Sequence, residues 1–129
     1  MATTIASYYT DELHEWNEAI LFYNEEIDNT EDRFADIIRR DSITTIADKV
    51  EAHQNSINQV AEKFLHLQFL IHQQEMILKN DSQLLEDHLI NEETEKQQEK
   101  LRTQMKELEI EYAAIKFNCN QFISDLLKK

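Results

Sequence analysis

Two residues on which most folds rely are missing from this chain, which contains no glycine and no proline. Both residues serve the tight turns between strands, so their absence argues against an all-β fold and against most α/β folds. It also excludes the glycine-rich loops that cradle phosphates, because only glycine lets a backbone approach a phosphate so closely. Long helices joined by short connections are the remaining architecture.

Cysteine and long apolar runs are scarce as well. The single cysteine, Cys119, has no partner for an internal disulfide, which favours a reducing, cytoplasmic location. The opening segment lacks the basic and apolar regions of a secretion signal. No run approaches the roughly 18 apolar residues of a membrane-spanning helix. We therefore expect neither export nor membrane insertion.

Acidic residues, by contrast, are abundant. The chain has 26 Asp and Glu against 13 Lys and Arg, which gives a net charge of −13. This charge repels nucleic acids and anionic lipid headgroups, so we expect no nucleic-acid partner and no membrane partner. A membrane-bending helical dimer is disfavoured for the same reason. Apolar residues make up 41% of the chain, enough for a packed core, so a disordered chain is not expected.

Apolar residues recur in alternating steps of three and four through nearly the whole chain, which is the spacing of a helix face packed against other helices. The phase breaks at RRDS (39–42) and at KNDS (79–82), where Asn80 is expected to end a helix in the left-handed conformation. The predicted fold class is all-α, an antiparallel three-helix coiled-coil bundle in a single domain covering 1–129. The predicted helices are about 8–39, 42–79 and 82–128, with Ile27, Ile57 and Leu108 among the buried residues.

The start of the third predicted helix is polar. Its core positions, continued backwards from Leu101, include Gln98, Thr94 and Asp87. The tract NEETEKQQEK (91–100) is therefore predicted to be a solvated helix without a core face. Pairing through the 79–82 turn would set this tract opposite residues 62–71, the most apolar part of the second helix. That part would then carry more apolar surface than its own chain can cover.

The surplus apolar surface of the second helix predicts an interface. Four residues at helical spacing form an outer line, on nearly the opposite side from the core positions. Two apolar residues of the first helix are expected at the same height. The predicted interface residues are the outer line Leu65, Phe69, His72 and Met76, together with Leu21 and Phe22.

Cover from within the chain is the alternative to an interface. It would come from apolar residues near the start of the third helix and from the N-terminus. The covering residues would be Leu84, Leu85, Leu89, Ile90, Ile5, Tyr8 and Tyr9.

Candidate catalytic and metal-binding groups do not converge in the predicted bundle. A metal site between helices needs several inward carboxylates and histidines, typically with Glu-x-x-His motifs, and this motif does not occur. Asp87 is the only carboxylate and His53 the only histidine at a predicted core position. We therefore expect no enzyme, no cofactor and no metal site. His53 is expected to pack or to set the helix register, and Cys119 to be buried and inert.

Two functions remain open at this stage. The first is a non-enzymatic helical interaction or assembly module that self-associates, most simply as a homodimer, or binds a partner helix through its apolar 62–78 end. A change in the charge of His72 would then make assembly depend on pH. The alternative is a helical-bundle ligand- or metal-binding protein with a pocket near His53 or His72.

Overall fold

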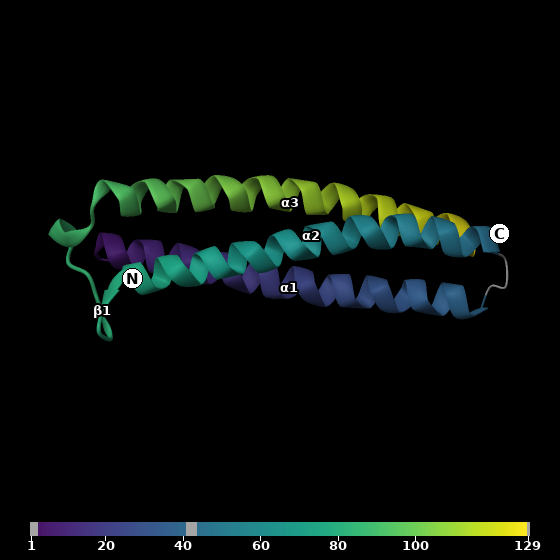
Figure 1. Cartoon of the computed structure of the whole chain (residues 1–129), viewed down its shortest axis with the longest axis horizontal. Helices are drawn as coiled ribbons and strands as arrows, with labels where there is room; N and C mark the ends of the chain where they lie inside the picture. Colours follow the sequence, from purple (N-terminus) through teal and green to yellow (C-terminus); the bar gives the residue numbers. More distant parts are fainter. Residues whose placement is uncertain (1–2, 41–43, 129) are drawn as a thin grey trace.

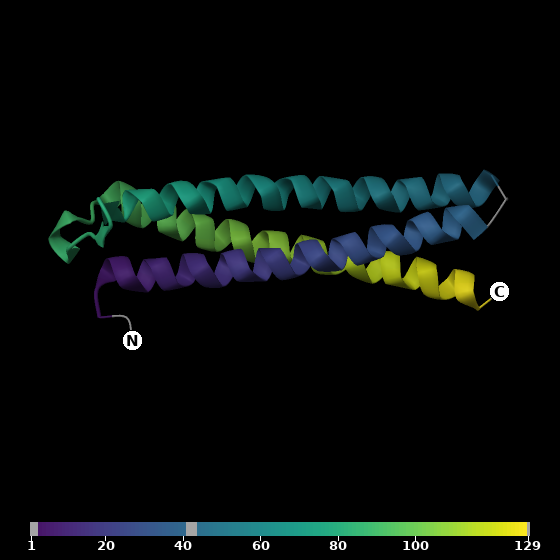
Figure 2. The same ribbon diagram turned by 90° about the horizontal axis from the view of Figure 1, so that it is seen from below.

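The computed structural model describes residues 3–40 and 44–128, and three long helices make up most of them. The chain runs along one helix, returns along the second and runs forward again along the third, as two perpendicular views show (Figures 1 and 2). The predicted all-α three-helix bundle is confirmed, while its coiled-coil character stays a prediction. The helices are α1 (Ile5–Arg40), α2 (Thr44–Ile77) and α3 (Glu92–Leu127).

The core of the bundle follows the predicted heptad pattern. The five buried residues of α1 lie seven positions apart, and they are Ala6, Leu13, Ile20, Ile27 and Phe34. Ile57 of α2 and Leu108 of α3 are buried as well, as predicted. Since each apolar side chain of this size contributes about 1.5–3 kcal/mol when fully buried, these positions are the main source of the bundle's stability.

Both ends of α1 have sequence features that suit a helix terminus. At the start, the Ser7 amide donates to Thr4 Oγ1 at 3.1 Å and the Thr4 amide donates to Ser7 Oγ at 3.0 Å, a reciprocal cap. At the end, Arg39 and Arg40 place positive charge beside the negative pole of the helix. The predicted connection at 40–42 falls largely on residues 41–43, which lie outside the described residues.

The connection between α2 and α3 is longer than predicted. A two-stranded hairpin, β1 (Lys79–Asn80) and β2 (Gln83–Leu84), is followed by a short 3-10 helix, η1 (Asp87–Leu89). Asp81, and not the predicted Asn80, has the positive φ, 59°, because a two-residue hairpin turn requires that conformation at its first residue. The prediction that the third helix begins at 82 is wrong.

Helix α3 begins at Glu92 because the sequence supplies a cap and a favourable first turn there. The side chain of Asn91 accepts a hydrogen bond from the Thr94 amide at 2.8 Å. Three acidic residues, Glu92, Glu93 and Glu95, lie in the first turn, where the helix dipole favours negative charge. Asn91 followed by acidic residues is a signal for the start of a helix, and the prediction from the heptad pattern did not take it into account.

The late start of α3 changes its register against α2. Lys63 Nζ lies 2.6 Å from Glu111 Oε1, and Gln74 Nε2 donates to the Thr94 carbonyl at 3.1 Å. The tract 91–100 therefore lies beside the end of α2 and not beside residues 62–71 as predicted. The shift has a simple cause, since the predicted first ten residues of the third helix belong to the connection.

The tract 91–100 is not the solvated helix that was predicted, because two of its core positions are buried. Gln74 of α2 joins Thr94 and Gln98 of α3 in a buried polar layer. Gln74 Nε2 donates to Gln98 Oε1 at 3.1 Å, and Gln98 Nε2 donates to the carbonyl of Tyr9 at 3.2 Å. The heptad positions were read correctly, but hydrogen-bonded amides fill them in place of apolar side chains.

Candidate interaction surface

An aromatic cluster in the middle of the bundle packs against the inner face of α2, opposite its outer line. Phe64, fully buried, stacks on Tyr23 of α1 with ring centroids 5.4 Å apart and meets Tyr112 of α3 edge-on at 5.7 Å. Tyr23 donates to Glu109, and Tyr112 donates to Glu26 at 2.9 Å. These contacts come from all three helices, so they fix the rotation of α2 about its own axis.

The two phenols of this cluster stay protonated at neutral pH. The hydrogen bond to Glu109, burial and nearby carboxylates raise the pKa of Tyr23 to about 12. Burial and the hydrogen bond to Glu26 raise the pKa of Tyr112 further above its ordinary value. Each phenol therefore remains a hydrogen-bond donor at neutral pH.

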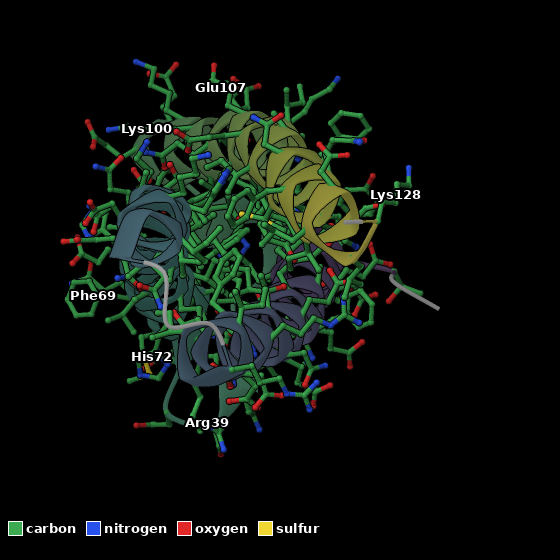
Figure 3. The ribbon with its side chains drawn as sticks, turned by 90° about the vertical axis from the view of Figure 1, so that its right-hand side faces the viewer. Arg39, Phe69, His72, Lys100, Glu107 and Lys128 are labelled. Carbon is green, nitrogen blue, oxygen red and sulfur yellow. The ribbon has the colours of Figure 1, made fainter. Side chains whose placement is uncertain are left out.

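With α2 held in this way, its outer line faces solvent. Leu65, Phe69 and Met76 are 69%, 56% and 63% exposed, and His72 is exposed too. Phe69 lies two residues from both Leu67 and Ile71, about 200° around the helix from these buried positions. In the end-on view, Phe69 and His72 project from α2 on the side away from α3 (Figure 3). The structure thus places all four residues of the outer line on one exposed face.

Helix α1 borders this face. The Gln68 side chain donates to Asn17 Oδ1 at 3.4 Å, which sets residue 17 and its helical neighbour Leu21 on the α2 side of α1. Leu21 is 52% exposed and extends the face. Phe22 is exposed as well, but it lies about 100° further around α1, so it points away from the outer line.

None of the described residues, 3–40 and 44–128, covers the outer line, whose apolar side chains are all more than half exposed. Three of the residues that would supply such cover are themselves exposed, namely Leu84 and Leu89 of the connection and Tyr8 of α1. The connection instead docks on the start of α1, where the Ile5 amide donates to Asp87 Oδ1 at 2.9 Å. Asp87 is therefore an exposed cap for α1 and not the inward carboxylate that was predicted.

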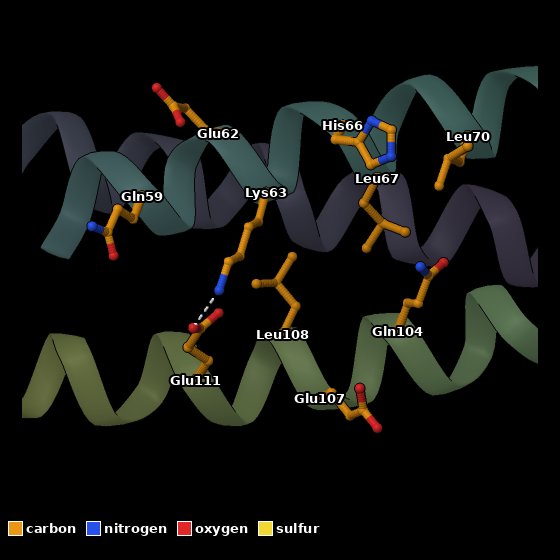
Figure 4. A pocket seen from close by; sticks show the side chains of 10 residues that line it. All are labelled: Gln59, Glu62, Lys63, His66, Leu67, Leu70, Gln104, Glu107, Leu108 and Glu111. Carbon is orange, nitrogen blue, oxygen red and sulfur yellow. Dashed lines mark hydrogen bonds and ion pairs between the residues drawn. The ribbon is translucent and has the colours of Figure 1, made fainter.

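An elongated groove of about 750 Å³ runs between α2 and α3. Leu67, Leu70 and Leu108 contribute its apolar walls, and charged residues line its edges (Figure 4). The ion pair between Lys63 and Glu111 bridges the two helices at one end of the groove. Neither His53 nor His72 lines this groove, so it does not coincide with the pocket considered from the sequence.

His53 is half-buried between two aromatic rings. Its ring stacks on Phe122 with centroids 4.5 Å apart and on Phe34 at 6.2 Å, and its Nδ1 lies 3.9 Å from Cys119 Sγ. Burial raises the pKa of the Cys119 thiol to about 11, so the thiolate that a nucleophile requires is scarce at neutral pH. Within residues 3–40 and 44–128, no three His, Cys, Asp or Glu side chains gather closely enough to hold a metal ion.

Sequence reasoning missed one exposed apolar group, Ile110 and Phe117 on the outer face of α3. The signal was available, since the two residues lie seven positions apart and each lies two positions from core residues. The prediction for the third helix covered its core series only, and Ile110 and Phe117 lie outside that series.

Comparisons of the chain with protein-family models, curated proteins and solved structures found no match. None of the described helices has both the length and the apolar character needed to cross a bilayer. The function is therefore inferred from the surface of the bundle itself.

Proposed function

We propose that this protein is a non-enzymatic assembly module that forms a homodimer through the outer line of α2. One observation carries the proposal: three large apolar side chains at helical spacing stand uncovered on one face of a helix whose opposite face is fully packed. Contiguous apolar surface of this kind is typical of an interaction site. The single buried cysteine fits a reducing, cytoplasmic setting.

The charge distribution favours a second copy of the chain as the partner. With a net charge of −13, two copies repel each other wherever their acidic surfaces meet. The outer line avoids this repulsion, since the stretch between Lys63 and Glu75 contains no Asp, Glu, Lys or Arg. Two copies that meet there bury apolar atoms without bringing carboxylates together.

The spacing of the outer line is self-complementary when two copies of α2 pack antiparallel about a twofold axis. An axis that passes between Leu70 and Ile71 sets Leu65 of one copy against Met76 of the other, and Phe69 against His72. Every large side chain of the line then meets a large side chain of the second copy, as an isologous interface requires. At the centre of this interface, no residue of the outer line is left facing solvent.

A stable dimer also needs a sufficient contact area. A specific interface buries about 800 Å² per partner, which is roughly a tenth of the 8906 Å² exposed by the chain. The outer line spans about 17 Å along α2, and an antiparallel pair brings the two α1 helices to the same side of the interface. Leu21 then adds apolar area from each copy.

The decisive experiment compares the wild-type protein with the double variant Leu65→Glu/Phe69→Glu by sedimentation velocity at high micromolar concentration. We expect the double variant to lose the α2–α2 contact and keep its helix content, because both side chains are exposed and their replacement leaves the core intact. Burying four carboxylates at the twofold axis costs far more than the lost apolar area.

Ile77→Glu is the matched control. Ile77 is 52% exposed on the same helix but lies about 100° around it from Met76, so it should leave assembly unchanged. Added salt should tighten the wild-type complex because it screens like charges, whereas binding to a basic partner would weaken. A monomeric wild-type protein, or equal effects of the control and the double variant, would refute the homodimer.

A further inference from the structure

The outer face of α3 carries a second exposed apolar surface, which we call the α3 stripe: Ile110, Ala113, Ala114 and Phe117. Ile110 and Phe117 are each 66% exposed. The four positions follow the i, i+3, i+4, i+7 spacing of one helix face. Ile110 lies two residues from both Leu108 and Tyr112, about 200° around α3 from these buried positions, so the stripe points away from the bundle.

Charge is nearly absent around this stripe. Between Glu111 and Asp125 the only charged residue is Lys116, in a chain where 30% of residues are charged. Lys116 turns toward α1, where its Nζ lies 2.6 Å from Glu26 Oε2. The exposed residues that extend the stripe toward the C-terminus, Asn118, Asn120 and Gln121, are polar without charge. A strongly acidic protein thus keeps about three turns of one helix face free of charge.

We propose that the α3 stripe is a second self-association surface, on which α3 of one copy packs antiparallel against α3 of another. With the twofold axis between Ala113 and Ala114, Ile110 of one copy meets Phe117 of the other. The two alanines at the centre let the helix backbones approach closely, since the interaxial distance depends on the side chains at the contact.

Charge complementarity selects both the orientation and the partner. In the antiparallel pair, Lys106 meets the uncharged Gln121, and at the ends Glu99 meets Lys128 of the other copy. A parallel, in-register pair would set Lys106 against Lys106 and Glu99 against Glu99, which is unfavourable. The pattern therefore fits a second copy of this chain in one orientation, and no basic partner is required.

The α3 stripe and the outer line of α2 lie on different sides of the bundle. The outer line faces away from α3 (Figure 3), whereas the stripe is the outward face of α3 itself. A chain that uses both twofold contacts forms assemblies larger than a dimer, with alternating α2 and α3 contacts. This larger assembly rests on the function proposed above, but pairing through the α3 stripe does not.

The test uses the Leu65→Glu/Phe69→Glu variant, in which the α3 stripe is the remaining surface. Sedimentation velocity should give a dimer for this variant, and adding Phe117→Glu should halve the mass. Adding Leu127→Glu is the matched control, since Leu127 is 80% exposed on the same helix but lies about 80–100° around it from Phe117 and Ile110. A monomeric double variant, or a dimer that survives Phe117→Glu, overturns the proposal.

Crosslinking gives positive evidence that does not depend on disruptive variants. In the same background with Cys119→Ser, Ala114→Cys should form a disulfide dimer on oxidation, because the two copies of residue 114 lie side by side at the axis. Thr103→Cys is the control, since its two copies would lie about 30 Å apart. Equal crosslinking at both positions overturns the proposal. If Phe117→Glu alone makes the protein monomeric, the α2 contact proposed above has failed and the α3 contact stands.

Discussion

Near the end of α1 and the start of α2, rings fill the core, whereas amides fill it at the opposite end. Phe34, His53 and Phe122 lie against one another with centroid distances of 4.5–6.2 Å. At the other end, Gln74 donates to the Thr94 carbonyl and to Gln98 Oε1, and Gln98 donates to the Tyr9 carbonyl. Both groups occupy heptad positions of the same helices.

The two ends differ mainly in how strictly their contacts fix the position of one helix along another. An aromatic contact is weakly directional and tolerates small shifts of one helix along another. A buried amide must find donors and acceptors in specific places, because leaving one unpaired costs about 1–3 kcal/mol. We infer that the aromatic end contributes more to stability than the polar layer does, and that the polar layer fixes how the three helices align.

Phe34→Ala should have the largest effect on this comparison. Phe34 is fully buried at the aromatic end, so its truncation leaves a cavity and should lower the free energy of unfolding by about 3–5 kcal/mol. Urea denaturation followed by circular dichroism measures the loss. Ile38→Ala, at a 40% exposed position of the same helix, is the control and should cost much less. Equal losses would contradict the assignment of stability to the aromatic end.

Gln98→Leu should have the second largest effect and lower the free energy of unfolding by about 1–3 kcal/mol. It removes one of the two acceptors of Gln74 Nε2 and the donor to the Tyr9 carbonyl and to Glu12. The double variant Gln74→Leu/Gln98→Leu should recover much of this loss, because Gln74 Oε1 has no hydrogen-bond partner within the described part of the chain. A double-mutant cycle by urea denaturation tests this. Additive losses would show that the two amides are not coupled.

Acid should destabilise the polar end of the bundle, because protonation of Glu12 weakens its hydrogen bonds with Gln98 and Arg102. Burial pushes the pKa of Glu12 upward, but hydrogen bonds from Arg102 and Gln98 and the charge of Arg102 outweigh burial, so the pKa lies below its ordinary value. A carboxylate with a lowered pKa contributes stability above the unfolded pKa of about 4.3, and loses that contribution as the pH falls through the lowered value.

The stability difference between the wild-type protein and Glu12→Gln should therefore shrink as the pH falls below about 4. Thermal unfolding at a series of pH values measures it. Glu15→Gln, at an exposed position of the same helix, serves as the control. A difference that is constant from neutral to acid pH would mean that Glu12 is not held in its charged form.

His53→Leu should have the smallest effect, within about 1 kcal/mol in either direction. The substitution loses the stacking on Phe34 and Phe122 but removes a half-buried polar ring. Chemical denaturation at neutral pH gives the value. A loss as large as that expected for Phe34→Ala would show that the imidazole holds a partner beyond these two rings.

The heptad pattern was enough to predict the helix number, most core positions and the exposure of the outer line. It predicted the break at 79–82 but not the length of the connection, because residues 79–91 contain neither glycine nor proline to mark where the connection ends. Asp81 adopts the positive φ that glycine would usually supply. With the start of α3 misplaced, the register against α2 was wrong, although most of the core positions predicted from Thr94 onward are buried.

The candidate surface was only partly predictable for a different reason. An outer line such as Leu65, Phe69 and Met76 stands out in sequence because it adds to an already apolar segment. Ile110 and Phe117 lie in a segment of ordinary composition, so their exposure became evident only once the core face of α3 was placed. The sequence also could not show that Leu21 points toward the outer line and Phe22 away from it. The contact between Asn17 and Gln68, which sets the rotation of α1 against α2, shows this.

The hydrogen bond from Ile5 to Asp87 joins the first residue of α1 to the connection, 82 positions away in sequence. Amides in the first turn of a helix have no partner within the helix, so they ordinarily exchange their protons with solvent quickly. In this protein the Ile5 amide should exchange only when the connection detaches from α1. Its hydrogen-exchange rate therefore gives a local reading of how often the connection opens, separate from the unfolding of the bundle.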